Sequence, residues 1–269
     1  MAAIDAVLRS VDRPVLAPSD GYHKIPGARF VQSDTAAYLS ALKEGDLLWV
    51  ETPCNPLLSV VDIAAVCEAA HSVGALVAVD NTVATPSGQT PLALGADFSV
   101  CAGTKGLSGH SDVLYGSVAC ATAASKEGVE GVRRHGGGIL GPFEAYLAYR
   151  SLATLELRVA RSSETALALA QALDVPTFHP YFSEVAPSQM RHFGPLVSFD
   201  LGTQEAAERF LSRCVLVEEA TSFGGVHSTA ERRARWGTDD VSPGLIRLSA
   251  GIEDTDDIVA DVLAALSAS

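Results

Sequence analysis

The chain has 269 residues, 48% of them hydrophobic and 6% aromatic, and a formal net charge of −13 at pH 7. This length and apolar content suffice for one large or two small packed domains and exclude a disordered chain. The acidic balance argues against a nucleic-acid partner, because phosphates require a basic surface, and no apolar run reaches the roughly 18 residues of a membrane span.

The cysteine pattern indicates reduced thiols. The chain has an odd number of cysteines, without a CxxC pair or a Cys/His cluster: Cys54, Cys67, Cys101, Cys120 and Cys214. Residues 1–14 also lack the basic and long apolar regions of a signal peptide. We therefore expect a cytoplasmic protein with neither disulfides nor a bound metal ion.

The first 121 residues alternate between expected strands and helices. Apolar runs predict strands over 15–17, 28–32, 46–50, 75–79, 97–101 and 114–121. Apolar spacing predicts helices over 2–10, 34–42 and 62–72, and Asp34 has the side chain of an N-cap. This βαβ order is typical of a mostly parallel sheet.

The rest of the chain predicts a smaller α+β unit. The Gly-rich segment over 122–141 is expected to be a mobile loop, and helical spacing predicts one long helix over 142–172 that joins two domains. Further strands are expected over 196–201, 215–218 and 245–248, and helices over 204–213 and 254–267. We therefore predict a large domain over 1–150 and a small C-terminal domain over 151–269.

Polar side chains follow three successive strands of the first half. The strands that end near residues 50, 79 and 101 run into Glu51 and Asn55, Asp80 and Thr82, and Thr104 and Lys105. Because ligands bind at the carboxyl ends of parallel strands, we expect these residues to converge on one site. The alternative is that they are ordinary caps and turns.

The loop SVCAGTKGLSGHSD, residues 99–112, places one lysine among glycines and hydroxyl side chains. Lys105 could form a Schiff base with a carbonyl cofactor, although a lysine in such a loop is more often a solvated surface residue. Pyridoxal phosphate also needs a carboxylate at its ring nitrogen, hydroxyls at its phosphate and an aromatic face. Asp80, Thr104 and Tyr22 supply these groups, and the prediction rests on the set rather than on any one of them.

Five motifs resemble, in order, the signatures of the Cys/Met-metabolism pyridoxal-phosphate-dependent enzymes. They are ETPCNP, VAVDNT, GTKGLSGHSD, GPFEAYLAYRSLATLELR and LIRLSAGIED, and they cover nearly the whole chain. The resemblance implies the aspartate-aminotransferase-like α/β architecture of fold type I, with a mostly parallel sheet and a small C-terminal α+β domain. It also implies pyridoxal 5′-phosphate as the cofactor, bound by the domain over 1–150.

The resemblance implies a role for each matching residue on the cofactor side. Lys105 resembles the lysine that binds the cofactor aldehyde, Asp80 the partner of the ring nitrogen, and Tyr22 the aromatic residue stacked on the ring. Asn55 resembles the asparagine near the cofactor 3′-oxygen, and Glu51 resembles the acid that supports the site. The expected cofactor-binding residues are Lys105, Asp80, Thr82, Tyr22, Asn55, Thr104 and Glu51.

On the substrate side, Arg247 resembles the arginine that binds the α-carboxylate, for which a guanidinium fork is suited. The alternative for Arg247 is a surface salt bridge. Ser222 and Asn55 resemble residues that face the substrate. Lys105 and Tyr22 are the expected catalytic residues, and the expected partner is a small sulfur-containing amino acid.

The sequence departs from the family pattern around the phosphate. Ala102 stands where the family usually has a serine, and losing one hydrogen bond to a charged group costs roughly 1.5–3 kcal/mol unless Ser108 or a neighbour compensates. Thr221 stands where many members have glutamate, which bears on substrate choice.

The start of the chain also departs from the pattern. Met1-Ala2-Ala3-Ile4 resembles a helix start that lies well inside the family's chains, and the segment between Tyr22 and Glu51 looks shorter than usual. We therefore expect the cofactor domain to be incomplete, without the Tyr-x-Arg that reaches the neighbouring subunit's phosphate. A truncated gene model and a genuine short form are both open.

The resemblance implies a carbon–sulfur lyase that converts cystathionine to cysteine, 2-oxobutyrate and ammonia by γ-elimination, in transsulfuration. The alternatives are γ-replacement of the cystathionine-forming type, γ-elimination of methionine, or a truncated non-catalytic member. A plain nucleotide-binding domain lacks support, because neither phosphate-loop motif follows a strand. The expected assembly is a homo-oligomer, a dimer of dimers if the N-terminal segment is present.

Overall fold

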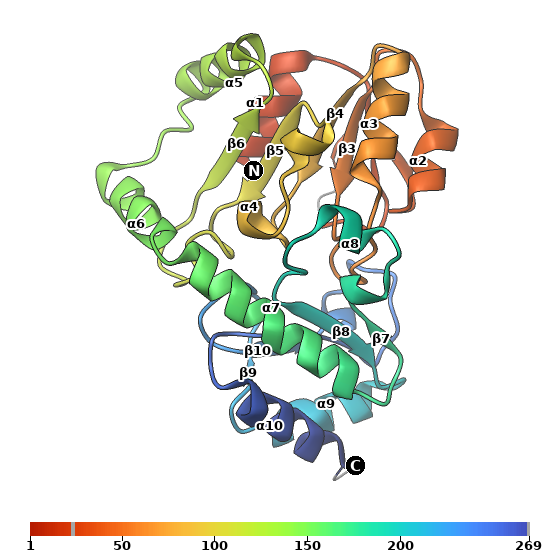
Figure 1. The fold of residues 1–269 in the computed structure, drawn as a ribbon, viewed down its shortest axis with the longest axis vertical. Coiled ribbons are helices and arrows are strands. Elements are labelled where there is room, and N and C mark those ends of the chain that lie inside the picture. Colours follow the sequence, from red (N-terminus) through yellow and green to blue (C-terminus); the bar gives the residue numbers. More distant parts are fainter. Residues whose placement is uncertain (23–24, 268–269) are drawn as a thin grey trace.

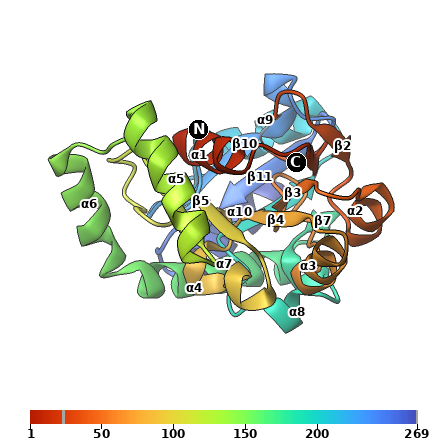
Figure 2. The same cartoon turned by 90° about the horizontal axis from the view of Figure 1, so that it is seen from above.

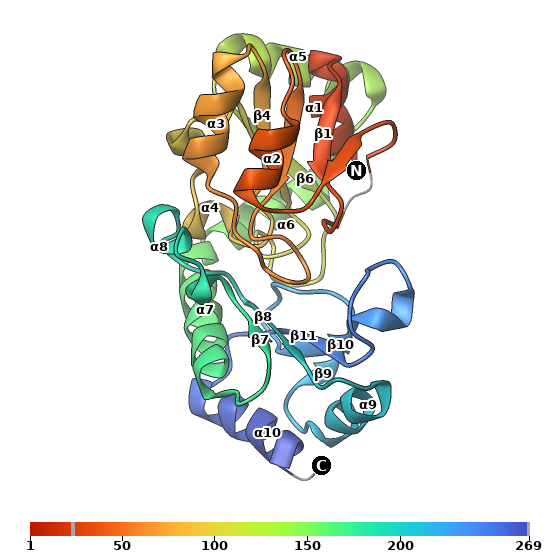
Figure 3. The same cartoon turned by 90° about the vertical axis from the view of Figure 1, so that its right-hand side faces the viewer.

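Residues 1–22 and 25–267 are described by a computed structural model, in which they form two β-sheets surrounded by helices (Figure 1). One sheet is built by the first half of the chain and the other by the second half, and they lie toward opposite ends of the long axis (Figures 1 and 3). Helix α7 (Leu155–Ala172) leads from one to the other (Figure 1). None of the helices in the two described ranges is both long and apolar enough to cross a membrane.

The first sheet has the strand order β2-β1-β3-β4-β5-β6. Its strands are β1 (Val15–Pro18), β2 (Arg29–Val31), β3 (Leu47–Glu51), β4 (Leu76–Asp80), β5 (Phe98–Ala102) and β6 (Gly116–Cys120). The first five run parallel, and β6 pairs antiparallel with β5. The expected mostly parallel sheet is therefore confirmed, and its register places Glu51 opposite Asp80.

Helices cover both faces of this sheet because its central strands are apolar on both sides. The helices are α1 (Ala2–Val11), α2 (Thr35–Ala41), α3 (Ile63–Ser72) and α5 (Ala123–Gly136). In β3, Leu48 and Val50 pack in the core shared with α2 and α3, whereas Leu47 and Trp49 pack in the core shared with α1. Figure 2 shows α1 and α3 on opposite sides of the strands.

The segment over 122–141, expected to be a mobile loop, is largely the helix α5. Its N-cap Thr122 accepts a hydrogen bond from the Ser125 amide at 3.1 Å, and Val129 is buried in the core shared with α1. The helix ends at Gly137, whose φ of 76° suits a glycine. The prediction was wrong because capping and packing against α1 outweigh the low helix propensity of the glycines.

The long helix expected over 142–172 is two helices, α6 (Pro142–Leu152) and α7. At the break, Arg158 donates to the Ser151 carbonyl at 2.9 Å and to the Thr154 hydroxyl at 3.1 Å, which stabilises the two helix ends there. The spacing of apolar residues continues across the break, so periodicity alone does not reveal it. Short helical segments include α4 (Thr85–Gly88), α8 (Ala186–Gln189) and the 3₁₀ turns Pro91–Leu94, Pro180–Phe182 and Arg233–Trp236.

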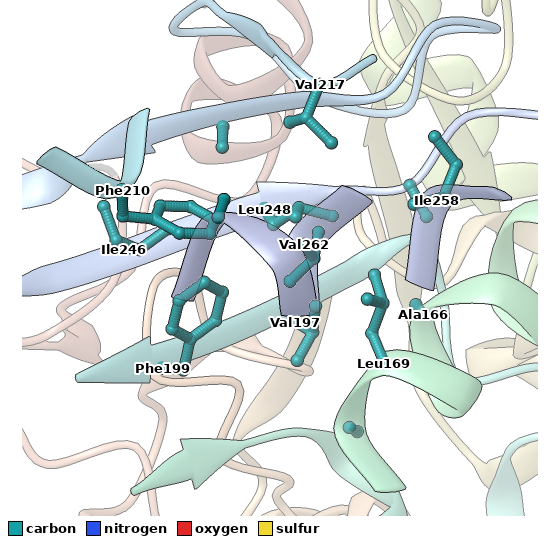
Figure 4. Packing of buried hydrophobic residues seen from close by; sticks show 14 of the residues in the cluster. Ala166, Leu169, Val197, Phe199, Phe210, Val217, Ile246, Leu248, Ile258 and Val262 are labelled. Atoms are coloured by element: carbon teal, nitrogen blue, oxygen red, sulfur yellow. The ribbon is translucent and has the colours of Figure 1, made fainter. Parts of the chain in front are cut away.

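The second sheet has the order β7-β8-β11-β10-β9 and is antiparallel except between β9 and β10. Its strands are β7 (Thr177–Phe178), β8 (Leu196–Asp200), β9 (Glu218–Glu219), β10 (Thr229–Arg232) and β11 (Leu245–Ser249). The core between this sheet and the helices α7, α9 (Gln204–Arg213) and α10 (Thr255–Ser267) includes Leu169, Phe199, Phe210, Leu248 and Val262 (Figure 4).

The strand expected over 215–218 is wrong in its extent, since β9 contains only Glu218–Glu219. The amides of Val215, Leu216 and Val217 instead donate to the Asp261 carboxylate of α10, at 2.9, 3.0 and 3.2 Å. Those amides are therefore not available to a strand ladder. Strand β10 has no counterpart among the expected elements. The division of the chain into domains at residue 150 stays a prediction.

Candidate active site

The carboxyl ends of β3, β4 and β5 bring five of the expected site residues around one cavity, and the loop after β1 adds Tyr22. Phe223 closes it from the second half of the chain. The residues that line it are Tyr22, Glu51, Asn55, Asp80, Thr82, Val83, Ala102, Lys105 and Phe223. The parallel register explains the convergence, because neighbouring strands end side by side at the same edge.

Glu51 organises the two loops that carry Tyr22 and Asn55. Its carboxylate accepts the Asn55 amide at 2.9 Å and the Tyr22 amide at 2.8 Å. Residue 21 is a glycine, which allows the Glu51 carboxylate to approach the backbone here; a Cβ at residue 21 would lie only 2.8 Å from Oε2 of Glu51. Burial, reinforced by the negative charge of Asp80, raises the pKa of Glu51 to about 8.

Asp80 is a buried carboxylate held by its neighbour. Within the described part of the chain, its side chain accepts two hydrogen bonds, from the Thr82 amide at 3.0 Å and the Thr82 hydroxyl at 2.5 Å, both to Oδ1. The Thr82 oxygen in turn accepts the Ala102 amide at 2.8 Å. Burial raises the pKa of Asp80, and the hydrogen bonds from Thr82 oppose that rise. Such a carboxylate suits a cationic ring nitrogen as its partner.

Lys105 extends its amine toward the second half of the chain. Nζ donates to the Ser222 hydroxyl at 3.0 Å and lies 4.9 Å from the centre of the Phe223 ring. The two loops press together at Gly224, where φ is 76° and a Cβ would lie 2.7 Å from the Gly106 nitrogen. Burial and the nearby Arg247 charge lower the pKa of Lys105, which increases the fraction of neutral, nucleophilic amine.

Arg247 of β11 joins the second sheet to the cavity. One terminal nitrogen, Nη1, donates to Oδ1 of Asn55 at 2.7 Å. The other, Nη2, donates to the Thr221 carbonyl at 2.7 Å and to Glu231 at 2.5 Å. Only 3% of Arg247 is exposed, so the surface salt bridge considered from the sequence is excluded.

Thr104 lies outside this cavity, in a second one that shares Asp80 and Ala102 with the first. The first residues of α1, with no side-chain cap, line the same second cavity. The Thr104 hydroxyl accepts the Tyr115 amide at 3.1 Å. Amides of a first helical turn and a hydroxyl are groups that bind a phosphate.

Ser108 does not supply the hydroxyl that Ala102 lacks. Its Oγ donates to the Thr104 carbonyl at 3.0 Å, and its side chain is fully buried beneath the loop. The compensation considered from the sequence is therefore wrong for Ser108, because this hydroxyl closes the Lys105 loop.

Two residues near the site, Arg158 and Glu231, were not predicted from the sequence to have a role there. Arg158 is buried, and it donates to the carbonyls of Gly106 and Leu107 at 2.7 and 3.1 Å as well as to the start of α7. It therefore ties the loop that follows Lys105 to the junction of α6 and α7. No local sequence signal identifies these contacts, which join residues about fifty positions apart.

The arrangement fits pyridoxal phosphate. The Lys105 amine, whose pKa is lowered, the buried carboxylate of Asp80 and the aromatic Tyr22 share one cavity, and a cavity lined by the start of α1 adjoins it. Together with the parallel sheet and the smaller second sheet, the site defines a pyridoxal-phosphate-dependent enzyme of fold type I.

The chain belongs to the Cys/Met metabolism PLP-dependent enzyme family, whose model matches residues 28–267. It is 50% identical to the "Putative cystathionine gamma-lyase" of Streptomyces coelicolor, over 99% of this chain and 74% of that protein. It is 37% identical to the cystathionine gamma-synthase of Mycobacterium tuberculosis, over 99% of this chain and 78% of that protein. The family confirms pyridoxal 5′-phosphate as the cofactor.

Solved structures confirm the fold. The structure of metB from Corynebacterium glutamicum matches with a TM-score of 0.93 and 34% identity, over all of this chain and 79% of that chain. The methionine gamma lyase CalE6 from Micromonospora echinospora matches with a TM-score of 0.87 and 38% identity, over 98% of this chain and 80% of that chain. The roles of the individual site residues stay predictions.

Proposed function

We propose that this protein is a carbon–sulfur lyase that converts cystathionine to cysteine, 2-oxobutyrate and ammonia by γ-elimination. The observation that carries the proposal is the placing of the Lys105 amine and the Asp80 carboxylate in one cavity, with the Arg247 guanidinium bonded to Asn55 of the same cavity. The relatives named cystathionine gamma-lyase in Streptomyces coelicolor and Bacillus subtilis support this activity.

On the cofactor side, Lys105 would hold the aldehyde and Tyr22 would cover the ring. Asp80, oriented by Thr82, would keep the ring nitrogen protonated, and Thr104 with the start of α1 would hold the phosphate. When bound, pyridoxal phosphate accepts electrons from the substrate's Cα and so eases the loss of protons and of the leaving group.

On the substrate side, Arg247 would bind the α-carboxylate and so orient the substrate. The Lys105 amine would remove the proton at Cα and then move a proton at Cβ, with Tyr22 assisting. Ser222, 3.0 Å from Nζ, would keep the amine near the reacting carbons. The thiol of cysteine leaves from Cγ, and water completes the release of 2-oxobutyrate and ammonia.

A second candidate is γ-replacement, in which a leaving group such as the succinate of O-succinylhomoserine departs from Cγ and a thiol adds there in its place. The relatives named cystathionine gamma-synthase in Mycobacterium tuberculosis and O-succinylhomoserine sulfhydrylase in Pseudomonas aeruginosa favour it. The same Lys105 and Arg247 contacts would serve both reactions up to that step. Methionine γ-elimination is a third variant, supported by the relative named L-methionine gamma-lyase in Pseudomonas deceptionensis.

The test compares products from one preparation of the protein saturated with pyridoxal phosphate. We expect 2-oxobutyrate from cystathionine at a higher kcat/KM than from methionine, and little cystathionine from O-succinylhomoserine plus cysteine. Faster cystathionine formation would instead establish the γ-replacement function. A protein that binds the cofactor but yields no product in any of these assays would support the non-catalytic alternative.

The cellular setting belongs to the same proposal. The free cysteines support a reducing, cytoplasmic location. The exposed aromatic side chains of Phe143, Tyr146 and Tyr149 on α6 support a homo-oligomer, because apolar surface of this kind is usually covered. Light scattering of the purified chain tests the assembly, and a monomeric mass would contradict it.

A further inference from the structure

A buried charge network lies behind Arg247, and the proposed function uses none of its other members. Its centre is Glu231 of β10, which is fully buried and pairs in register with Arg247 of β11. One oxygen, Oε1, accepts from Arg247 at 2.5 Å and from Arg233 at 2.6 Å. The other oxygen accepts from the indole nitrogen of Trp236 at 2.9 Å.

The network is balanced in charge. The remaining nitrogens of Arg233 pair with Asp239, at 2.9 Å from Nε and 2.5 Å from Nη2. Two guanidinium groups thus meet two carboxylates, and the Glu231 oxygen bridges the two cations. A buried bridge of this kind is strongly destabilised when one partner loses its charge, because the other charges stay buried without compensation.

The bridge determines which nitrogen of Arg247 can receive a ligand. Nη2 has two hydrogens, and Glu231 and the Thr221 carbonyl accept both. Nη1 gives one hydrogen to Asn55. Among the described residues nothing accepts the second hydrogen of Nη1, so an incoming carboxylate is directed to the nitrogen that already bonds Asn55 of the cavity lining.

We propose that Glu231 is the positioning residue of Arg247: by engaging Nη2 it fixes the guanidinium so that Nη1 receives the α-carboxylate of the amino-acid substrate. This inference rests on the proposed function, in which Arg247 binds that carboxylate. Arg233 and Trp236 hold Glu231 in place, and none of the three touches the substrate.

The experiment uses two probes that differ only by a carboxylate, L-2-aminobutyrate and propylamine. Their dissociation constants are measured from the change in visible absorbance of the enzyme saturated with pyridoxal phosphate. In Glu231→Gln, we expect the dissociation constant of L-2-aminobutyrate to rise at least tenfold and that of propylamine to change less than twofold. The KM for cystathionine should rise with a much smaller change in kcat.

The matched control is Glu219→Gln on the neighbouring strand β9. Glu219 also pairs with an arginine, Arg235, at 2.8 Å, but both side chains are largely exposed. We expect this control to bind both probes as the wild type does. Trp236→Phe removes the hydrogen bond to Oε2 of Glu231, and we expect it to raise the dissociation constant of L-2-aminobutyrate two- to threefold without changing that of propylamine. It provides the test if Glu231→Gln does not fold.

Three results would overturn the inference. Equally weakened binding of both probes in Glu231→Gln would show a general structural role. Unchanged binding of both would show that Glu231 is not needed to position Arg247. Tighter binding of L-2-aminobutyrate would show that net charge outweighs positioning. If the wild type itself binds the two probes equally, Arg247 does not bind the α-carboxylate, and both that part of the proposed function and this inference are wrong. A preference for L-2-aminobutyrate that survives in Glu231→Gln and Trp236→Phe would overturn the inference alone.

Discussion

The carboxylates of Glu51 and Asp80 lie opposite each other at the ends of adjacent parallel strands, and both are buried. Burial raises the pKa of each carboxyl, and the negative charge of Asp80 raises that of Glu51 further. The two differ in their partners, because Glu51 accepts two backbone amides whereas Asp80 is held by Thr82. A cationic group that binds beside Asp80 would restore the charged form of that carboxylate and leave Glu51 as the support of the loops.

Glu51 should make the stability of the cofactor-free protein depend on pH. Its pKa is about 8 in the native protein and near 4.5 when the chain is unfolded, so the native state binds the extra proton between these values. The stability contributed by this group is therefore present below pH 4.5 and is lost as the pH rises to about 8. We expect the Tm of the wild type to fall more steeply from about pH 5 to about pH 8 than the Tm of Glu51→Gln. The exposed Glu68→Gln serves as a control and should follow the wild type, whereas parallel curves for Glu51→Gln would contradict the assignment.

Arg158 should stabilise the Lys105 loop. Its guanidinium makes four hydrogen bonds, to the carbonyls of Gly106, Leu107 and Ser151 and to the Thr154 hydroxyl. Arg158→Met should lower the free energy of unfolding by about 3 kcal/mol, since several hydrogen bonds to a charged group are lost together. Urea denaturation measures this change. Arg161→Met, one turn further along α7 and partly exposed, should change it by less than about 0.5 kcal/mol.

Restoring a hydroxyl at residue 102 should strengthen cofactor binding. Ala102 lines both cavities, beside Asp80 and the start of α1. In Ala102→Ser, one added hydrogen bond to a phosphate should lower the Kd for pyridoxal phosphate by about tenfold, equivalent to about 1.4 kcal/mol. Equilibrium dialysis measures the Kd, and Ala119→Ser on the exposed side of β6 is the control. An unchanged Kd in Ala102→Ser would place the phosphate elsewhere.

The fold was largely predictable where local signals and apolar runs agree. Asp34 caps α2 as the sequence suggests, and the apolar run over 46–50 forms a strand buried on both faces. The predictions failed where packing decides the outcome. Helix α5 forms against α1 despite its glycines, and the Arg158 side chain bonds at a break between α6 and α7 that the apolar spacing does not reveal.

The candidate site was predictable on the cofactor side and less so on the substrate side. Asp80 and Lys105 follow strands directly, and the parallel sheet alone brings them together. Glu231 meets Arg247 only through the antiparallel register of β10 and β11, and β10 was not predicted. No sequence pattern specifies that pairing, since it depends on how a strand of the second sheet is aligned with its neighbour.

The central claim is that Lys105 binds pyridoxal phosphate and carries the proton transfers. The most direct measurement is the visible absorbance of the purified protein with the cofactor, for the wild type and for Lys105→Ala, together with 2-oxobutyrate release from cystathionine. We predict a visible band in the wild type that Lys105→Ala lacks, and a loss of kcat/KM on the order of 10³-fold or more, since one residue serves as both nucleophile and base. The same absorbance and the same rate in Lys105→Ala would contradict the account.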